Sequence, residues 1–362
     1  MRNRSLLIIG LLLSILMTAC SPKEEDSNTQ IILTETNKGE YAYLIPFVSS
    51  DTRSYHGTYQ SRHDINEIGI GLEEYSKAYF APADYYVQEG VVINRNTLLN
   101  LVARESDTNT QGLNPSKGSS FLTGNGDERV VDPVIVTDVF ELDFIKKKNT
   151  EMTIEGITLA MVVNKNQRVT VDGATVNYTL TDDSLWEYAS NAGRKLESYL
   201  RTLDGIADMP IYILIYSTAS SDETLPGGYI GGGYFTGRSG QFTRFNEKWV
   251  LMPTTEGSQI DSDTYNKLLN MKRAVLEFLP ESVNIIAEAK YVNNEPTLLK
   301  IKLRVQGKTY AEVRALTQYC VQLIQDFNKD IRIIVTVDSN DEIVAIIERA
   351  IDSDEVLTTY IN

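Results

Sequence analysis

Beyond Val130 the chain carries two kinds of apolar pattern. Short apolar or alternating runs bounded by polar residues and glycine are typical of strands, and longer stretches with apolar residues every three or four positions are typical of helices. The predicted strands span residues 134–145, 152–163, 211–217, 229–235, 242–252, 283–292, 298–305 and 331–338, with a further short apolar segment at 343–347. The predicted helices span residues 184–203, 261–278 and 309–327.

Two of these helices, at 184–203 and 309–327, share one apolar stripe. At a shift of 124 residues the apolar positions coincide, and the pairs are Ala189 and Val313, Ala192 and Leu316, Leu196 and Cys320, Tyr199 and Leu323, Leu200 and Ile324, and Leu203 and Phe327. The following strand also matches, Ile211 to Ser217 against Ile333 to Ser339, at a shift of 122. We therefore predict an α+β fold of duplicated strand-strand-helix-strand units, each helix covering one face of a mainly antiparallel sheet. The predicted domains are 41–255 and 256–362, and the helix at 261–278 joins the copies.

The first twenty residues have the pattern of an export signal. Arg2 and Arg4 precede an apolar or small run over residues 6–17, and the small residue Ala19 stands directly before Cys20. Because this run is shorter than the roughly 20 residues that a spanning helix needs, we predict a signal peptide at 1–19 that is cleaved between Ala19 and Cys20.

A small residue before the first cysteine resembles the bacterial lipobox, in which the thiol takes a diacylglyceryl group and the cysteine becomes the new N-terminus. Met17 stands where that motif most often has Leu, which changes shape but not polarity. We predict lipidation of Cys20, and two acyl chains supply the stable anchoring that one chain does not. Residues 20–40 are then the lipidated cysteine and a polar, flexible tether. The expected location is the outer face of the cell membrane.

Length, charge and cysteine content further limit the classes of protein to which this chain can belong. With 362 residues, 42% of them hydrophobic, the chain is long enough for globular domains with real cores. The net charge of -15 includes Arg2 and Arg4, so the mature chain carries -17, and we expect no nucleic-acid partner. Lipidation of Cys20 leaves only Cys320, which excludes an intramolecular disulfide. Since Cys320 lies on a helical apolar stripe, we expect a buried small hydrophobe and not a reactive thiol.

The motifs of common catalytic sites are missing. His56 and His63, the two histidines, lack the His-x-x-x-His spacing of a helical metal site, and we expect both at the surface. No Gly-x-Ser-x-Gly, Cys-x-x-Cys or phosphate loop occurs, so we expect no metal and no cofactor. The Gly-rich run at 226–235 is not followed by a helix, which favours a bulged strand or a flexible loop over dinucleotide binding. Residues 107–128 are expected to form a long surface loop.

Polar and aromatic residues are densest between Glu67 and Glu89. The candidate binding surface consists of Glu73, Tyr75, Lys77, Tyr85, Tyr86 and Glu89. Carboxylates such as Glu73, Glu74 or Glu89 could also act as an acid and base pair, since glycoside hydrolases need two such groups across one cleft. A solvated charged face over an aromatic core is the alternative. We assign no catalytic residue.

Several ordered segments resemble the CamS family of Gram-positive lipoproteins, the sex-pheromone precursors. They are Gly71-Leu72, Ser76-Lys77, Phe80, residues 85–90 (Tyr-Tyr-Val-Gln-Glu-Gly), 112–115 (Gly-Leu-Asn-Pro), Pro210-Ile211, 226–229 (Pro-Gly-Gly-Tyr) and 246–253 (Asn-Glu-Lys-Trp-Val-Leu-Met-Pro). The resemblance spans most of the mature chain. It implies two structurally related repeats, in agreement with the duplication inferred from the apolar stripes.

The resemblance also implies that the known activity belongs to the signal and not to the mature domain. Signal peptidase would release the signal, and an intramembrane protease would trim it to a short apolar peptide sensed by plasmid-bearing neighbours. In this sequence that peptide is Leu12 or Leu13 through Ala19, and its residues are Leu12, Leu13, Ser14, Ile15, Leu16, Met17, Thr18 and Ala19.

Three functions stay open at this point. The chain could be a pheromone precursor, a surface binding or assembly module with a cell-wall or protein ligand, or a wall-directed hydrolase. A mating assay on the synthetic peptide separates the first, and ligand capture compared with activity on wall fragments separates the other two.

Overall fold

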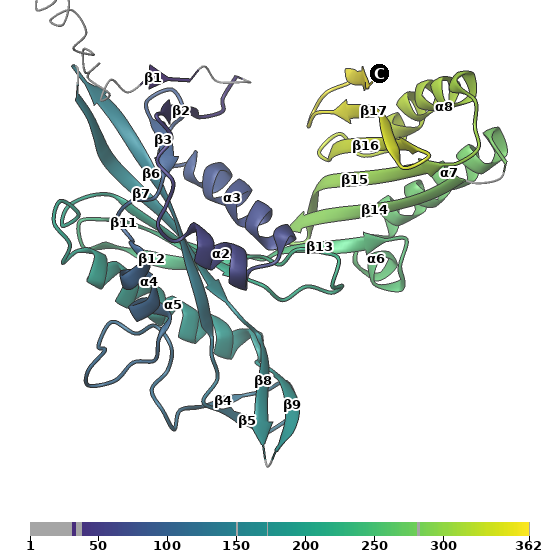
Figure 1. The fold of residues 1–362 in the computed structure, drawn as a ribbon. Coiled ribbons are helices and arrows are strands. Elements are labelled where there is room, and N and C mark those ends of the chain that lie inside the picture. Colours follow the sequence, from purple (N-terminus) through teal and green to yellow (C-terminus); the bar gives the residue numbers. More distant parts are fainter. Residues whose placement is uncertain (1–30, 34–37, 150, 172, 281–282, 362) are drawn as a thin grey trace, which may run out of the picture.

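The computed structural model describes residues 31–33, 38–149, 151–171, 173–280 and 283–361. The predicted signal peptide, the peptide Leu12 to Ala19 and Cys20 lie outside the described residues. Two sheets form the body of the molecule, and helices pack against each of them (Figure 1).

The first sheet has the strand order β1-β2-β3-β6-β7-β10-β11-β12. Its strands are β1 (Ile31–Ile32), β2 (Ala42–Ile45), β3 (Tyr86–Glu89), β6 (Val136–Lys148), β7 (Glu151–Val163), β10 (Ile211–Ser217), β11 (Gly228–Thr236) and β12 (Ser239–Arg244). Two small hairpins accompany it, β4 (Ser120–Leu122) with β5 (Arg129–Val131) and β8 (Asn166–Val171) with β9 (Ala174–Thr179).

Helices cover both faces of this first sheet. The apolar sides of α5 (Asp182–Leu200) and α4 (Arg95–Val102) pack in one core with alternate residues of β7 and β10. The opposite residues of the same strands pack against α3 (Arg62–Ser76), which follows the short α2 (Arg53–Tyr59). Burial on both faces explains the unbroken apolar run of β10, all of whose residues are buried.

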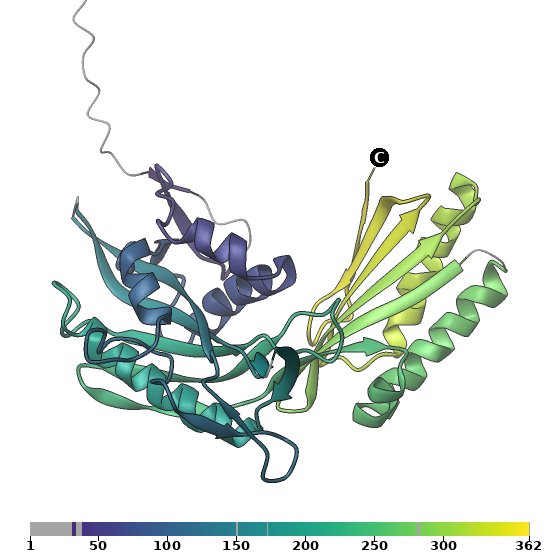
Figure 2. The ribbon, with the colours of Figure 1, turned by 60° about the horizontal axis from the view of Figure 1, so that its bottom comes forward.

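The second sheet has the strand order β13-β14-β15-β16-β17-β18. Its strands are β13 (Glu247–Met252), β14 (Val283–Val292), β15 (Glu295–Val305), β16 (Arg332–Ser339), β17 (Glu342–Arg349) and β18 (Val356–Tyr360). The helical elements are α6 (Thr255–Ile260), α7 (Ser262–Phe278), α8 (Tyr310–Leu323) and the 3-10 turn Ile324–Asp326. Helices α7 and α8 lie on the face that points away from the first sheet (Figure 2).

Strand pairing confirms the duplicated unit. In the first copy β6 pairs antiparallel with β7, β7 parallel with β10, and β10 antiparallel with β11. In the second copy β14, β15, β16 and β17 repeat these pairings in the same order and directions. The β8–β9 hairpin is an insertion in the first copy, between β7 and α5.

The helix-facing positions of the two copies also correspond. Helix α5 buries Ala189, Ala192 and Leu196, and α8 buries their partners at the shift of 124, Val313, Leu316 and Cys320. Each helix lies over the odd-numbered residues of its two central strands, from Ile157 and Ile211 in one copy and from Leu299 and Ile333 in the other. The α+β prediction is therefore confirmed in its topology.

Some local predictions differ from the structure. The run at 242–252 is not one strand, because β12 ends the first sheet at Arg244 and β13 begins the second at Glu247. The chain thus passes from the first sheet to the second before the expected domain boundary at 255.

Other differences are local. The segment at 107–128 is mostly loop but contains β4, and Ile31–Ile32 in the expected tether pairs with β2. Helices α2, α3 and α4 had no counterpart among the predicted elements. The Gly-rich run forms β11, with a bulge in its pairing to β10. Of the two alternatives expected for this run, a bulged strand or a flexible loop, the structure has the bulged strand.

Candidate functional site

A buried ion-pair network joins the two sheets. Lys290 of β14 places its Nζ 2.5 Å from Glu67 Oε1 of α3 and 2.6 Å from Glu247 Oε1 of β13. The three side chains are 13%, 5% and 1% exposed. One lysine therefore neutralises part of the charge of two buried carboxylates, and it links the helix of the first part to a strand of the second.

Aromatic residues surround this network. Tyr75 of α3 donates its hydroxyl hydrogen to Glu247 Oε1 at 3.1 Å, and the backbone N–H of Tyr229 donates to Oε2 at 3.0 Å. The indole of Trp249 lies below the ammonium groups of Lys290 and Lys300, at 5.8 and 4.5 Å from the ring centroid. Both Glu247 oxygens thus have partners, as a buried charge requires.

Burial and neighbouring charges both shift the pKa values of Lys290 and Tyr75. Burial lowers the pKa of Lys290, but the carboxylates of Glu247 and Glu67 outweigh it and hold that pKa above the ordinary value. Burial, together with Glu247, raises the pKa of Tyr75 well above its usual range. The network is therefore a fixed clamp at neutral pH, with a charged lysine and a neutral tyrosine.

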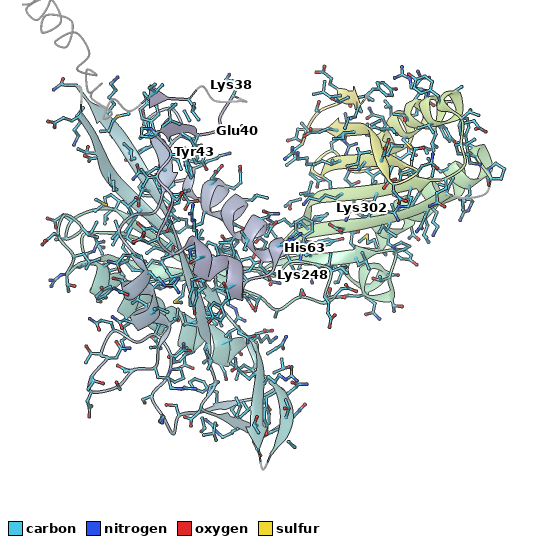
Figure 3. All side chains as sticks on the ribbon, in the orientation of Figure 1. Lys38, Glu40, Tyr43, His63, Lys248 and Lys302 are labelled. Atoms are coloured by element: carbon cyan, nitrogen blue, oxygen red, sulfur yellow. The ribbon has the colours of Figure 1, made fainter. Side chains whose placement is uncertain are left out.

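Helix α3 is held to the first sheet by further buried polar contacts. Asp64 accepts from the Tyr216 hydroxyl at 2.7 Å and from the Gly227 N–H at 2.9 Å, and the Tyr229 hydroxyl donates to the Ile68 carbonyl at 2.6 Å. The helix can approach this closely because Gly71 has no side chain; a Cβ there would lie 2.0 Å from the Tyr229 ring. Exposed His63 is at the start of this helix, on the side of the second sheet, where β13 carries Lys248 (Figure 3).

The residues of the candidate binding surface lie on α3 and β3 and in the segment between them, with separate partners. Glu73 accepts from the Tyr43 hydroxyl, Lys77 pairs with Glu74 at 2.6 Å, and Tyr75 belongs to the clamp. Tyr85 packs edge-on against Phe80 with Lys146 over its ring, and half-buried Tyr86 and Glu89 lie on β3. Only Tyr75 of this set reaches the second sheet, so the set does not act as one unit within the fold. Its role in binding stays a prediction.

An acidic pair, fully buried Asp143 and partly buried Glu141, lies beside Glu89. Glu141 accepts from the backbone N–H groups of Val92 and Ile93 at 2.8 and 2.7 Å, and Asp143 Oδ2 accepts from Val91 at 3.1 Å. Burial and the neighbouring Glu141 raise the pKa of Asp143 to about 9, and burial also raises that of Glu141. These carboxyl groups hold the chain between β3 and α4. Burial raises the pKa of Glu89 as well.

His56 departs from its prediction, because it is 9% exposed and not a surface residue. Its Nδ1 lies 2.9 Å from Asp138 Oδ1 and its Nε2 2.8 Å from Thr52 Oγ1, while the ring stacks on Phe140 at 3.9 Å. A fully buried carboxylate, Asp138, thus pairs with a histidine 82 residues earlier. Local sequence gave no sign of this partner.

The expected burial of Cys320 is found in the structure. Cys320 is buried on α8, and burial raises the pKa of its thiol to about 12. Within the described ranges, no three His, Cys, Asp or Glu side chains form a group that could hold a metal ion. In the same part of the chain, no helix has the length and apolar character needed to cross a bilayer.

The fold and the clamp define the class: an α+β protein of two duplicated sheet-and-helix units, joined through buried ion pairs. The family model described as CamS sex pheromone cAM373 precursor matches residues 47–355. This chain belongs to the CamS family.

Solved structures share this fold. A sex pheromone precursor from Lactobacillus salivarius subsp. salivarius UCC118 superposes with a TM-score of 0.80 at 22% identity, over 92% of this chain and 99% of that one. The C-terminal domain of the sex pheromone staph-cAM373 precursor from Staphylococcus aureus superposes with a TM-score of 0.68 at 20% identity, over 83% of this chain and 97% of that one. Comparison with curated protein sequences gives no match.

Proposed function

We propose that the chain is the precursor of a peptide pheromone and of a lipid-anchored surface protein. The observation that carries this is the coincidence of a CamS family match at 47–355 with an apolar signal that ends at Ala19 and Cys20. Cleavage before Cys20 leaves the diacylglyceryl-cysteine as the anchor on the outer face of the membrane. Trimming of the released signal yields the peptide from Leu12 or Leu13 to Ala19.

Two experiments test the two products. Replacing Cys20 with Ala should abolish lipid labelling and release the protein from the membrane fraction, whereas Cys320→Ala should change neither. Retention of the Cys20→Ala protein would refute the anchor. Synthetic peptides covering residues 12–19 and 13–19 should induce mating in plasmid-bearing cells, with a scrambled peptide as control, and an absent response would refute the pheromone role.

For the mature part we propose a binding module and not an enzyme. The support is that the carboxylates near the candidate surface hold structural partners: Glu73 binds Tyr43, Glu74 binds Lys77, and Glu141 binds backbone N–H groups. A wall-directed hydrolase is the second candidate, favoured by the raised pKa of Glu89 close to Glu141. Assay of wall fragments with the wild type and Glu89→Gln separates them, since turnover lost in the variant would establish hydrolysis.

A further inference from the structure

The second unit has a cavity of about 240 Å³ at the N-terminal end of α8. It is bounded by the start of the helix, the end of β16, the start of β17 and the end of β18. The residues that matter for its chemistry are Lys308, Tyr310, Arg314, Ser339, Val344 and Tyr360.

The first unit has a cavity of about 320 Å³ at the corresponding place. Ser217 ends β10 there as Ser339 ends β16. Ile230 and Val344 are the bulged residues of β11 and β17, since the pairing register shifts beside each of them. Because strand ends and bulges both coincide, the two cavities are equivalent products of the duplication.

The charges in the two cavities differ. In the first, Lys165 pairs with Asp182 at 2.5 Å, and Arg244, which lies over the Trp186 ring, pairs with Asp183 at 2.7 Å. The chain then continues across this cavity through residues 245–248 into the second sheet. The first cavity is therefore electrically balanced and carries the linker.

Neither cation of the second cavity forms an ion pair among the described residues. Glu312, whose pKa is lowered by its hydrogen bonds with Thr309 and by the charge of nearby Lys308, does not line the cavity. Arg314 lies 3.4 Å above the Tyr360 ring and 5.9 Å from that of Tyr310, and among the described residues it has neither a hydrogen bond nor an ion pair. Lys308 donates to the Pro280 carbonyl at 3.1 Å, which leaves other donors of its ammonium group free. No Asp or Glu is among the described residues that line the cavity. In a chain of net charge -15 this is a local excess of positive charge.

We propose that this cavity binds the free C-terminal carboxylate of a peptide that ends in an apolar residue. A guanidinium fixed by stacking on a tyrosine presents its planar fork of N–H donors to a carboxylate, which it can bind through two hydrogen bonds. The aliphatic wall at Val313 and Val344 suits an apolar side chain next to that carboxylate. The volume is below the roughly 300 Å³ typical of a whole small-molecule site, so only the last residue or two of the peptide enters. The site is independent of the fate of the signal peptide.

The test is calorimetric titration of the full chain with N-acetyl-Ala-Leu as the free acid and as the C-terminal amide. The acid should bind one to one, and the amide at least 10-fold more weakly. Arg314→Gln and Lys308→Gln should each weaken binding of the acid, the former by at least 10-fold. The matched control is Arg244→Gln in the equivalent cavity, which should leave the affinity unchanged.

Several outcomes would overturn the proposal. Equal binding of acid and amide would show that the carboxylate is not recognised, and binding unaffected by both Arg314→Gln and Lys308→Gln would place it elsewhere. Absence of binding at millimolar peptide would show that the cavity has no such ligand. Inorganic phosphate that binds at least as tightly as the acid would mark a simple anion site. Melting temperatures of all variants check that each is folded. If Arg314→Gln does not fold, the affinity of Lys308→Gln decides whether the acid binds in this cavity.

Discussion

Lys290 and Glu67 are 223 residues apart in the chain and form an ion pair between β14 and α3, with both side chains mostly buried. The pair joins the two units. Its removal by Lys290→Met leaves Glu67 and Glu247 as two buried carboxylates without a cation, which should lower the free energy of unfolding by about 3–5 kcal/mol. Urea denaturation measures this. Lys302→Met is the control, because Lys302 is 57% exposed in its pair with Glu288 and should change stability by less than about 0.5 kcal/mol.

The same lysine predicts a pH dependence in the alkaline range. Its pKa is raised in the folded state, so its contribution to stability is fully present below the ordinary lysine value of 10.5 and is lost as the pH rises through the raised pKa. Between pH 8 and pH 11.5 the wild type should therefore lose more stability than Lys290→Met. Parallel curves for the two proteins would show that Lys290 is not stabilised as a cation.

Two glycines on α3 differ in what surrounds them. A Cβ at Gly71 would meet the Tyr229 ring, whereas a Cβ at Gly69 would meet nothing within 4 Å. Gly71→Ala should thus destabilise the protein by about 1–3 kcal/mol through overpacking. Gly69→Ala should stabilise it by up to about 1 kcal/mol, because alanine favours the helix. Thermal unfolding of both variants gives the comparison, and equal midpoints would contradict the close approach of α3 to β11.

Asp143 should make the protein less stable as the pH rises. Burial and Glu141 raise its pKa from 3.8 to about 9, so between these values the folded state binds a proton that the unfolded state has lost. The free energy of unfolding then falls with pH across that range. Between pH 4 and pH 8 the wild type should lose more unfolding free energy than Asp143→Asn. The difference between the two losses should exceed about 1 kcal/mol, since one pKa unit corresponds to about 1.4 kcal/mol. Urea denaturation at the two pH values tests this, with exposed Asp84→Asn as the control.

Cys320 should behave as a core residue. Its thiol is buried and its pKa is raised to about 12 by that burial, so it should not react with a thiol reagent at pH 8 until the protein is unfolded. Cys320→Ala should cost about 1 kcal/mol of stability and leave membrane retention unchanged. Rapid labelling of the folded protein would instead indicate an accessible thiol.

The sequence by itself determined the repeated elements. Helix α5 and helix α8 could be placed, and matched at a shift of 124, because burial on one face leaves a period of about 3.6 residues in the chain itself. The strand at Ile211–Ser217 could be placed to the residue, since a strand buried on both faces is a continuous apolar run bounded by polar residues. Such patterns depend only on neighbours within one element.

Only the tertiary structure decided which elements meet. An apolar run such as 242–252 has the same pattern whether it stays in one sheet or crosses to another, so the change of sheet after Arg244 left no local sign. Glu67, Glu247 and Lys290 look like ordinary surface charges in the sequence, and His56 like a surface histidine. They are buried because they pair with residues up to 223 positions away in the chain. The local periodicity of apolar residues carries no information about such distant pairs.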